Sequence, residues 1–346
     1  MDLHIRGPIF SCSGYARIRH LIIELHRLGV NIQLTPFNII DRVHFDHIDL
    51  LKSLKKPRSA KISLSVGIPF QFQKQDCYNI GYTMFEASSI PKLWVACCND
   101  MDEIWVPTSS NKTTFEMCGV TVPIHVIPYG VDHNIFYPMK KKHSKFIFLA
   151  IGTYIDRKGW DVLFSAFTTA YNNNPKVQLI CKFDTSNHYS LSETKVLKDV
   201  ENIIVIDEKI NDEDIIELYR TANCFVLPTR GEAFCLPALE AITCGIPVII
   251  TENSGYGDFL NNKNSWFIKS KGLYPASPRL CTINPVYYNT WFQEPDESDL
   301  IRLLHHVVED KKDYHSKCNT VVDKAYFYEN IAQVVYSRLK EIERAL

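Results

Sequence analysis

Two glutamates, Glu232 and Glu240, have the types and spacing that best suit ligand chemistry. They lie in the run Pro228–Gly245, where the end of an apolar strand pattern is followed by a short loop and a helix pattern that begins near Pro237. A carboxylate about one turn into a helix can accept hydrogen bonds from two ribose hydroxyls, and we expect this of Glu240. A capping acid plus a solvent-facing helical glutamate is the alternative. The order of strand, loop, proline-started helix and glycine favours the ligand site.

The backbone at this helix start offers a second kind of chemistry. Free N–H groups at a helix amino terminus bind anions, helped by the helix dipole. We expect those of Phe234, Cys235 and Leu236, next to the small side chain of Ala233, to point at a diphosphate or a sugar. The segment therefore predicts an anion site beside the two acids.

Two basic residues, Arg157 and Lys158, directly follow another strand pattern, Phe146–Ile151. Ligands of open parallel sheets bind outside the carboxyl ends of the strands. Lys158 can supply a point charge to a phosphate, and Arg157 a bidentate fork. The alternative is a solvated pair in a loop, which is common.

The elements that must position these residues follow an alternating pattern. Short apolar runs rich in valine and isoleucine are typical of buried parallel strands; they are 146–151, 177–181, 203–206, 224–227 and 248–251. Helix patterns lie between them, at 160–171, 212–221 and 237–244. The alternation predicts an α/β doubly wound domain over roughly residues 145–320.

The first part of the chain is similar in kind. It predicts strands at 3–5 and 30–34, an amphipathic helix at 15–28, and strand ends at 103–107 and 125–127. Tyr137-Pro138, followed by three lysines, suits a hinge between two domains. The helix pattern 323–346 either completes the second domain or crosses back to the first.

Composition excludes several classes of function. The chain has 346 residues and a formal net charge of -1, so no basic field attracts nucleic acid. The eleven cysteines include no CxxC, and neither a disulfide framework nor a zinc site is indicated. The amino terminus lacks a signal-peptide pattern, and no apolar run approaches the ~20 residues that span a bilayer. We therefore expect a cytoplasmic protein.

The chain resembles the family 4 retaining glycosyltransferases. Their pattern of an acid, Gly-Phe-Gly-x-Pro and a second glutamate eight residues after the first is matched in spacing by Glu232 and Glu240. Their glycine followed by Lys-Gly is matched by Gly152, Lys158 and Gly159. The resemblance covers nearly all of the chain, and its motifs in the second domain are specific as a set.

The resemblance implies a GT-B fold, with two Rossmann-like domains that face each other across a cleft. Residues 1–138, completed by the helix 325–346, form the acceptor-side domain, and residues 139–324 bind the nucleotide sugar. It implies a metal-independent, cofactor-free hexosyltransferase that moves a sugar from a UDP- or GDP-sugar to a glycan, lipid or protein acceptor, with retention. Lys158 and Glu232 act on the reacting groups. The alternatives are a non-catalytic sugar-nucleotide-binding protein on the same scaffold and a sugar-nucleotide epimerase.

The motifs depart from the family pattern at three positions. Ala233 and Cys235 stand where the family has glycines, which permit a positive φ and close approach of a ligand. Thr153 stands where the family has a phosphate-binding arginine. Either Arg157 or Arg230 then replaces that charge.

Three features of the first domain carry further expectations. Gly14 resembles the family's glycine in the loop after the first strand, which lies against the diphosphate; a simple strand–helix turn is the alternative. Glu86 resembles an acid that projects beside the donor sugar, and the equal alternative is an acid at a helix start. The basic run Lys52–Lys61 could make peripheral contact with a membrane that carries a lipid-linked acceptor. The alternative, which we favour, is a solvated helix face.

Overall fold

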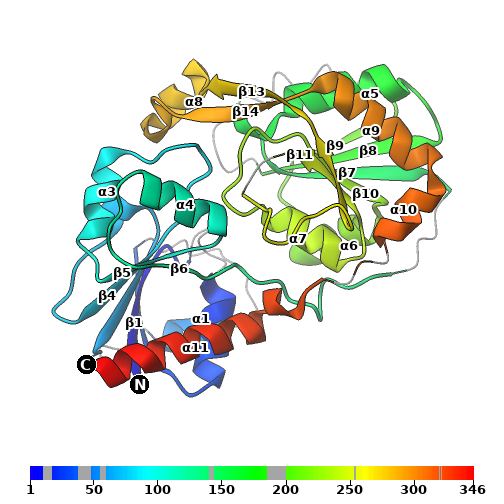
Figure 1. Cartoon of the computed structure of the whole chain (residues 1–346). Helices are drawn as coiled ribbons and strands as arrows, with labels where there is room; N and C mark the ends of the chain where they lie inside the picture. The colour runs from blue at the N-terminus through cyan, green and yellow to red at the C-terminus, as the bar shows by residue number, and fades with distance from the viewer. Residues whose placement is uncertain are drawn as a thin grey trace. The chain divides into compact units, whose positions relative to one another are not determined.

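The chain folds into two compact units. The computed structural model describes residues 1–10, 18–37, 48–54, 60–139, 144–184, 200–252, 255–318, 320 and 322–346. One unit consists of residues 1–130 with 323–346, and the other of residues 131–322. The division therefore falls after Gly130, a few residues before the Tyr137-Pro138 hinge expected from the sequence. Figure 1 shows the last helix, in red, beside the blue amino-terminal elements.

The first unit is built on a six-stranded parallel sheet in the order β2-β1-β3-β4-β5-β6. The strands are β1 (Asp2–Gly7), β2 (Asn31–Pro36), β3 (Ile62–Val66), β4 (Tyr78–Tyr82), β5 (Glu103–Val106) and β6 (Ile124–Val126). The reversal of strand order beside β1 makes the sheet doubly wound, because the crossover helices must lie on both of its faces.

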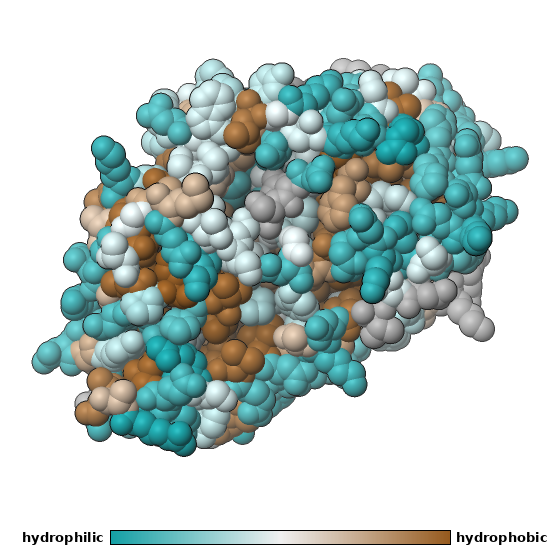
Figure 2. All heavy atoms as spheres, viewed as in Figure 1, coloured by the Kyte–Doolittle hydropathy of each residue, from teal (hydrophilic) through white to brown (hydrophobic). Residues whose placement is uncertain are grey.

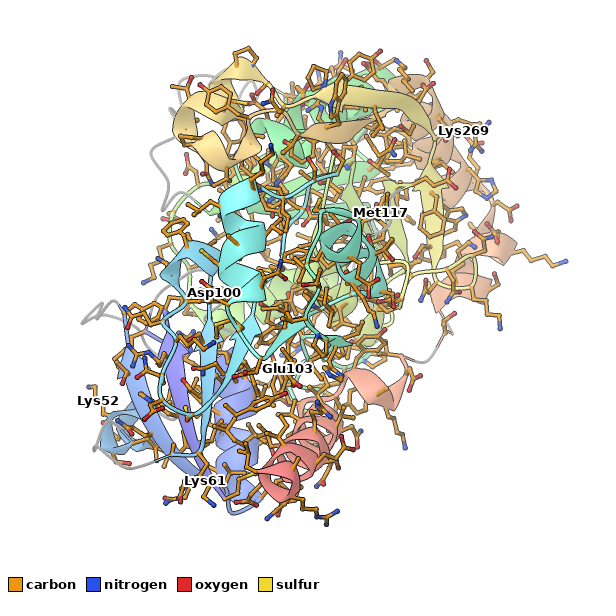
Figure 3. The ribbon with its side chains drawn as sticks, turned by 60° about the vertical axis from the view of Figure 1, so that its left-hand side comes forward. Lys52, Lys61, Asp100, Glu103, Met117 and Lys269 are labelled. Carbon is orange, nitrogen blue, oxygen red and sulfur yellow. The ribbon has the colours of Figure 1, made fainter. Side chains whose placement is uncertain are left out.

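The helices of the first unit are α1 (Ile18–Arg27), α2 (Ile48–Ser53), α3 (Lys92–Asn99), α4 (Ser109–Met117) and the terminal α11 (Tyr328–Ala345). Helix α11 packs on α1, where Tyr328 stacks on His20 with ring centroids 4.5 Å apart. Arg338 of α11 also binds the fully buried carboxylate of Glu103, at 2.5 Å, at the start of β5 (Figure 3). The end of the chain is thus held in the first unit by stacking and by an ion pair.

The second unit contains another six-stranded parallel sheet, in the order β12-β11-β10-β7-β8-β9. The strands are β7 (Phe146–Thr153), β8 (Val177–Asp184), β9 (Ile203–Ile206), β10 (Cys224–Leu227), β11 (Val248–Thr251) and β12 (Ser265–Ile268). Counted within the unit, this is the Rossmann order 3-2-1-4-5-6. The expected pair of Rossmann-like α/β units is confirmed.

Helices cover the second sheet. They are α5 (Trp160–Tyr171), α6 (Asp212–Thr221), α7 (Leu236–Thr243), α9 (Glu297–Glu309) and α10 (Lys311–Cys318). Helices α5 and α9 pack together over one hydrophobic core, which includes Phe148, Phe167 and Leu304. On the face drawn in Figure 2, the side chains around α9 and α10 are mainly hydrophilic, as expected of the outer face of amphipathic helices.

A small antiparallel hairpin, which no pattern in the sequence predicted, follows β12. Its strands are β13 (Ser270–Pro275) and β14 (Trp291–Pro295), and the helix α8 (Pro278–Ile283) and the 3-10 turn η5 (Pro285–Tyr287) lie between them. The hairpin is attached to the body of the unit through Arg230, whose backbone oxygen accepts a hydrogen bond from the N–H of Gln293 at 2.9 Å. It thereby adds a wall beside the carboxyl end of β7.

Candidate functional site

The strand order of the second unit fixes where a ligand can bind. Strands β7 and β10 are neighbours, but the chain leaves β7 toward β8 on one side and leaves β10 toward β11 on the other. Such a switch point opens a crevice at the carboxyl ends of the two strands. The 3-10 turn η3 (Asp156–Lys158) follows β7, and the loop with Glu232 follows β10. The two expected motifs therefore meet at the switch point.

A buried ion pair joins these motifs. The Nζ of Lys158 donates a hydrogen bond to Oε1 of Glu232 at 2.6 Å, and each residue is only 8% exposed. Arg157 Nη1 lies 3.3 Å from the same oxygen, and the Thr229 hydroxyl donates to it at 3.0 Å. Burial alone would raise the pKa of Glu232, but Lys158, Arg157 and the hydrogen bonds outweigh it and lower that pKa. Glu232 is therefore ionised at neutral pH.

Backbone packing brings the two loops into contact. Gly159 has a φ of +69°, and a Cβ there would lie 1.9 Å from the carbonyl oxygen of Pro228. The N–H of Arg230 donates to the carbonyl of Arg157 at 2.7 Å. A Cβ on Gly255 would lie 1.6 Å from the carbonyl oxygen of Glu232. The loop after β10 is thus fixed on two sides by glycines that admit no side chain.

The amino terminus of α7 lies directly after Glu232. The helix begins at Leu236, with Cys235 as its N-cap in a left-handed conformation (φ 64°, ψ 63°). This conformation explains physically why a glycine would be favoured at this position. Burial raises the pKa of the Cys235 thiol to about 12, so the sulfur remains protonated at neutral pH. Ala233 and Phe234 are buried beside it, and Leu236 is half-buried.

Glu240 lies within α7 and is buried. The Tyr219 hydroxyl of α6 donates a hydrogen bond to its Oε2 at 2.7 Å. This geometry excludes the alternative of a solvent-facing helical glutamate. Glu240 is instead a buried carboxylate that Tyr219 holds in a fixed orientation, and its binding of ribose hydroxyls remains a prediction.

The two arginines considered as phosphate ligands have different surroundings. The guanidinium of Arg230 binds Asp161 at 2.8 Å and Glu294 at 2.6 Å, and these carboxylates raise the arginine's pKa although burial opposes this. Arg157 instead contacts Glu232 and donates to the carbonyl of Gly231. Only Arg157 of the two shares the carboxylate that Lys158 binds.

The remaining expected residues belong to the first unit. Glu86 is half-buried in the loop between β4 and α3, and α3 begins only at Lys92, so Glu86 does not start that helix. Its placement beside a donor sugar remains a prediction. Gly14 lies outside the described residues, as does the middle of the basic run. The two ends of that run, Lys52 and Lys61, are exposed (Figure 3).

Membrane-spanning helices and metal clusters are both missing from the described ranges. No helix in them is long and apolar enough to cross a membrane. In the same ranges, no group of three or more histidine, cysteine, aspartate or glutamate side chains is arranged to hold a metal ion.

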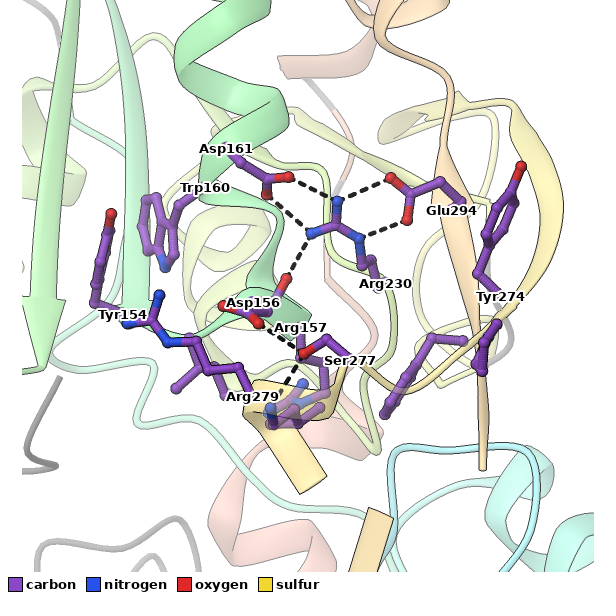
Figure 4. A pocket seen from close by; sticks show the side chains of 14 residues that line it. Tyr154, Asp156, Arg157, Trp160, Asp161, Arg230, Tyr274, Ser277, Arg279 and Glu294 are labelled. Carbon is purple, nitrogen blue, oxygen red and sulfur yellow. Dashed lines mark hydrogen bonds and ion pairs between the residues drawn. The ribbon is translucent and has the colours of Figure 1, made fainter. Parts of the chain in front are cut away.

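The structure also contains a pocket that the motifs did not indicate. It has a volume of about 440 Å³ and lies between the end of β7, the start of α5 and the hairpin (Figure 4). Arg157 and Arg230, which the sequence had singled out, are part of its lining, but the aromatic residues Tyr154, Trp160 and Tyr274 were not considered. No spacing signal indicates them, because the hairpin brings Tyr274 to α5 from a distant part of the chain.

Comparisons with known proteins match this chain to glycosyltransferases. Residues 133–273 match the model of the family described as Glycosyl transferases group 1. The mannosylfructose-phosphate synthase of Agrobacterium fabrum is 29% identical over 151 residues, which are 38% of this chain and 33% of that protein. A putative glycosyltransferase of a Sulfolobus islandicus filamentous virus is 24% identical over 242 residues, 67% of this chain and 65% of that protein. The chain thus spans between a third and about two thirds of these relatives.

Solved structures extend the likeness to the whole chain. Sucrose-phosphate synthase from Thermosynechococcus elongatus has a TM-score of 0.71 at 14% identity and covers 100% of both chains. Anabaena HepE in complex with UDP-glucose has a TM-score of 0.70 at 12% identity, covering 99% of this chain and 100% of that one. At such identities the likeness concerns the fold. With two Rossmann-like units and the match over residues 133–273, the chain is similar to the group 1 glycosyltransferases and has the GT-B fold that its motifs predicted.

Proposed function

We propose that the chain transfers a sugar from a UDP- or GDP-sugar to a glycan, lipid or protein acceptor, with retention at the anomeric carbon. The observation that carries the proposal is the buried pair of Lys158 and Glu232, with Arg157 beside it, at the switch point of the second sheet. Two cationic side chains and the amino terminus of α7 converge there. Converging positive groups at a strand end suit a diphosphate.

Each of these groups has a definite part in the proposed reaction. Lys158, Arg157 and the N–H groups at the start of α7 stabilise the negative charge that grows on the leaving diphosphate. Arg157, rather than Arg230, takes the place of the arginine missing at Thr153, since two carboxylates already bind Arg230. Glu240, oriented by Tyr219, accepts the ribose hydroxyls. Glu232 accepts hydroxyls of the donor sugar when the diphosphate attracts Lys158.

The bond changes balance without a further reagent. The bond between the anomeric carbon and the phosphate oxygen breaks, and a bond to the acceptor oxygen forms on the same face of the sugar. The acceptor hydroxyl gives its proton to the leaving phosphate oxygen. Diphosphate binding at fixed cations and N–H groups supplies the electrostatic stabilisation, so the proposed reaction requires no metal ion.

Relatives support the choice of donor. Their names include a mannosylfructose-phosphate synthase and D-inositol 3-phosphate glycosyltransferases, and HepE was solved with UDP and with UDP-glucose. Uridine diphosphate sugars are therefore the first donors to test, and guanosine diphosphate sugars are tested beside them.

A thermal-shift screen with UDP-, GDP- and ADP-sugars tests donor binding, because a ligand of the folded state raises its melting temperature by mass action. Transfer and donor hydrolysis are then measured with the donor that stabilises most. Lys158→Ala and Glu240→Ala should each lower donor affinity about tenfold or more. Lys317→Ala is the matched control, because Lys317 is also buried but pairs with Asp313.

The outcomes separate the proposal from its alternatives. Full transferase activity in Lys158→Ala or Glu240→Ala would contradict the assigned roles. Donor binding without transfer or hydrolysis would favour a non-catalytic binding protein. Conversion of the donor into another nucleotide sugar in the absence of an acceptor would favour an epimerase.

A further inference from the structure

The cavity of about 440 Å³ beside the hairpin, which we call the hairpin pocket, shares Arg157 and Arg230 with the expected motifs but extends beyond them to the hairpin. One wall comes from the end of β7 and the start of α5, with Tyr154, Asp156 and Trp160. The other comes from the hairpin, which supplies Tyr274 and half of the lining residues in all. These hairpin residues lie beyond the family match, which ends at residue 273. The hairpin half of the pocket therefore lies outside the matched family segment, whereas the other half lies within it.

Hydrogen bonds make the pocket rigid before any ligand arrives. Arg230 binds both oxygens of Asp161, at 2.9 and 2.8 Å, and both oxygens of Glu294, at 2.8 and 2.6 Å (Figure 4). The Ser277 hydroxyl, at the start of α8, donates to Asp156 at 2.7 Å. The two walls are thus joined at two points. A preformed pocket avoids most of the ordering cost of binding.

The charges of the lining balance. Three acids (Asp156, Asp161, Glu294) face three arginines (Arg157, Arg230, Arg279). A phosphate or sulfate group would meet the three carboxylates as well as the arginines, so the lining does not select an anion. A neutral ligand with several hydroxyls suits it better. Each carboxylate oxygen that Arg230 binds retains a second lone pair that can accept a ligand hydroxyl.

Aromatic rings provide the remaining recognition. Tyr154 and Trp160 lie on one side of the pocket and Tyr274 on the other (Figure 4). Tyr274 is 50% exposed, so it presents a ring to solvent although it is attached to a rigid hairpin. Flat apolar faces combined with fixed hydrogen-bonding groups recognise sugar rings, which have apolar C–H faces and polar edges.

We infer that the hairpin pocket binds a neutral saccharide unit of the acceptor. The assignment of this saccharide to the acceptor rests on the proposed transferase function, whereas saccharide binding by the pocket does not depend on it. Arg157 connects the two sites, because it lines the pocket and also lies 3.3 Å from Glu232. A saccharide in the pocket thus lies next to the residues proposed to bind the donor diphosphate.

The test is a glycan array of neutral and of sulfated or phosphorylated saccharides, probed with the full chain. Saturation-transfer NMR then measures the Kd of the best neutral saccharide on three variants. Tyr274→Ala should weaken binding about tenfold, and Tyr274→Phe should retain it, because the ring is the recognition element. Tyr288→Ala is the matched control: Tyr288 is a 61% exposed tyrosine of the same hairpin, outside the pocket lining, and its loss should leave the Kd unchanged.

Nucleotide-sugar stabilisation is measured on the same preparations. If Tyr274→Ala binds the saccharide as tightly as the parent, or if the array selects only anionic glycans or none, the inference is wrong. Saccharide binding that Tyr274→Ala abolishes, in a protein that no nucleotide sugar stabilises, supports the pocket and contradicts the proposed function. Nucleotide-sugar stabilisation without any saccharide binding supports the proposed function and contradicts the saccharide pocket.

Discussion

Replacing Glu232 with glutamine should destabilise the second unit by about 3 kcal/mol. The substitution keeps the size of the side chain but leaves Lys158 and Arg157 facing a neutral amide in a buried site. Removing one partner of a buried ion pair lowers the free energy of unfolding by about 3–5 kcal/mol. The lower end of this range applies here because the amide oxygen still accepts hydrogen bonds.

The pair also predicts a pH dependence with a definite sign. The pKa of Glu232 is lower in the folded state than its ordinary value of 4.5, so the folded state binds fewer protons there. The contribution of this ion pair to the free energy of unfolding is complete above about pH 4.5, and it is lost as the pH falls through the pKa of Glu232 in the folded state. Glu232→Gln should therefore remove part of the acid destabilisation expected of the parent chain.

Urea unfolding followed by tryptophan fluorescence measures the free energy, and hydrogen exchange of peptides from β7, β10 and α7 assigns the loss to this unit. Glu232→Gln combined with Lys158→Met should recover about 1 kcal/mol or more, because no unpaired lysine remains. Glu217→Gln, which removes a 63% exposed partner of Arg220, is the control and should change stability by less than about 0.5 kcal/mol. A Glu232→Gln protein as stable as the parent, with an unchanged acid transition, would refute the reasoning.

Three further changes test the backbone and the terminal helix. Cys235→Gly should be more stable in urea unfolding than Cys235→Ala by about 1 kcal/mol, since only glycine relieves the φ of 64°. Gly159→Ala should lower the free energy of unfolding by several kcal/mol, roughly the level at which folding fails, because the new Cβ would meet a main-chain oxygen. Gly29→Ala is the control: no other atom lies close to the position of its Cβ, so it should cost only about 1 kcal/mol. Arg338→Met should cost about 3 kcal/mol and speed hydrogen exchange in α11, because the buried carboxylate of Glu103 loses its arginine partner; unchanged protection of α11 would exclude this role.

Five of the six strands of the second sheet could be predicted from the sequence because each contains a run of mainly apolar residues, whereas β12 was not recognised. The bounds expected for β9, β10 and β11 agree with the structure, and α5 and α6 also begin and end where their patterns indicated. Strands buried on both faces give continuous apolar runs, and the acids in the first turn of α6 mark its start.

The first sheet was predicted only in part, because polar residues interrupt its buried strands. β3 contains Ser63 and Ser65, and β4 contains Asn79, all completely buried. The Asn79 side chain accepts from the N–H of Gln75 and donates to its carbonyl, which satisfies a polar group inside the unit. Such local pairing leaves no periodic signal, so neither strand was recognised.

The sequence predicted which residues belong to the site, but it did not predict the contacts between them. Lys158 and Glu232 are 74 positions apart, and only the strand order brings them together. The choice between Arg157 and Arg230 depended on Glu294, which reaches Arg230 from the unanticipated hairpin. Contacts that depend on topology or on an irregular insertion carry no local pattern in the sequence.

The loss of the two family glycines has a different meaning once the backbone is known. Cys235 keeps the left-handed conformation that a glycine would adopt freely, and such strain, about 1–3 kcal/mol, persists only where the surroundings determine it. Gly159 and Gly255 supply that constraint, because each brings another segment against the backbone of the loop after β10. The N–H groups at the start of α7 are therefore oriented before a ligand arrives. Donors that need no reorganisation stabilise developing charge most effectively, so the strained loop favours a catalytic role for this site.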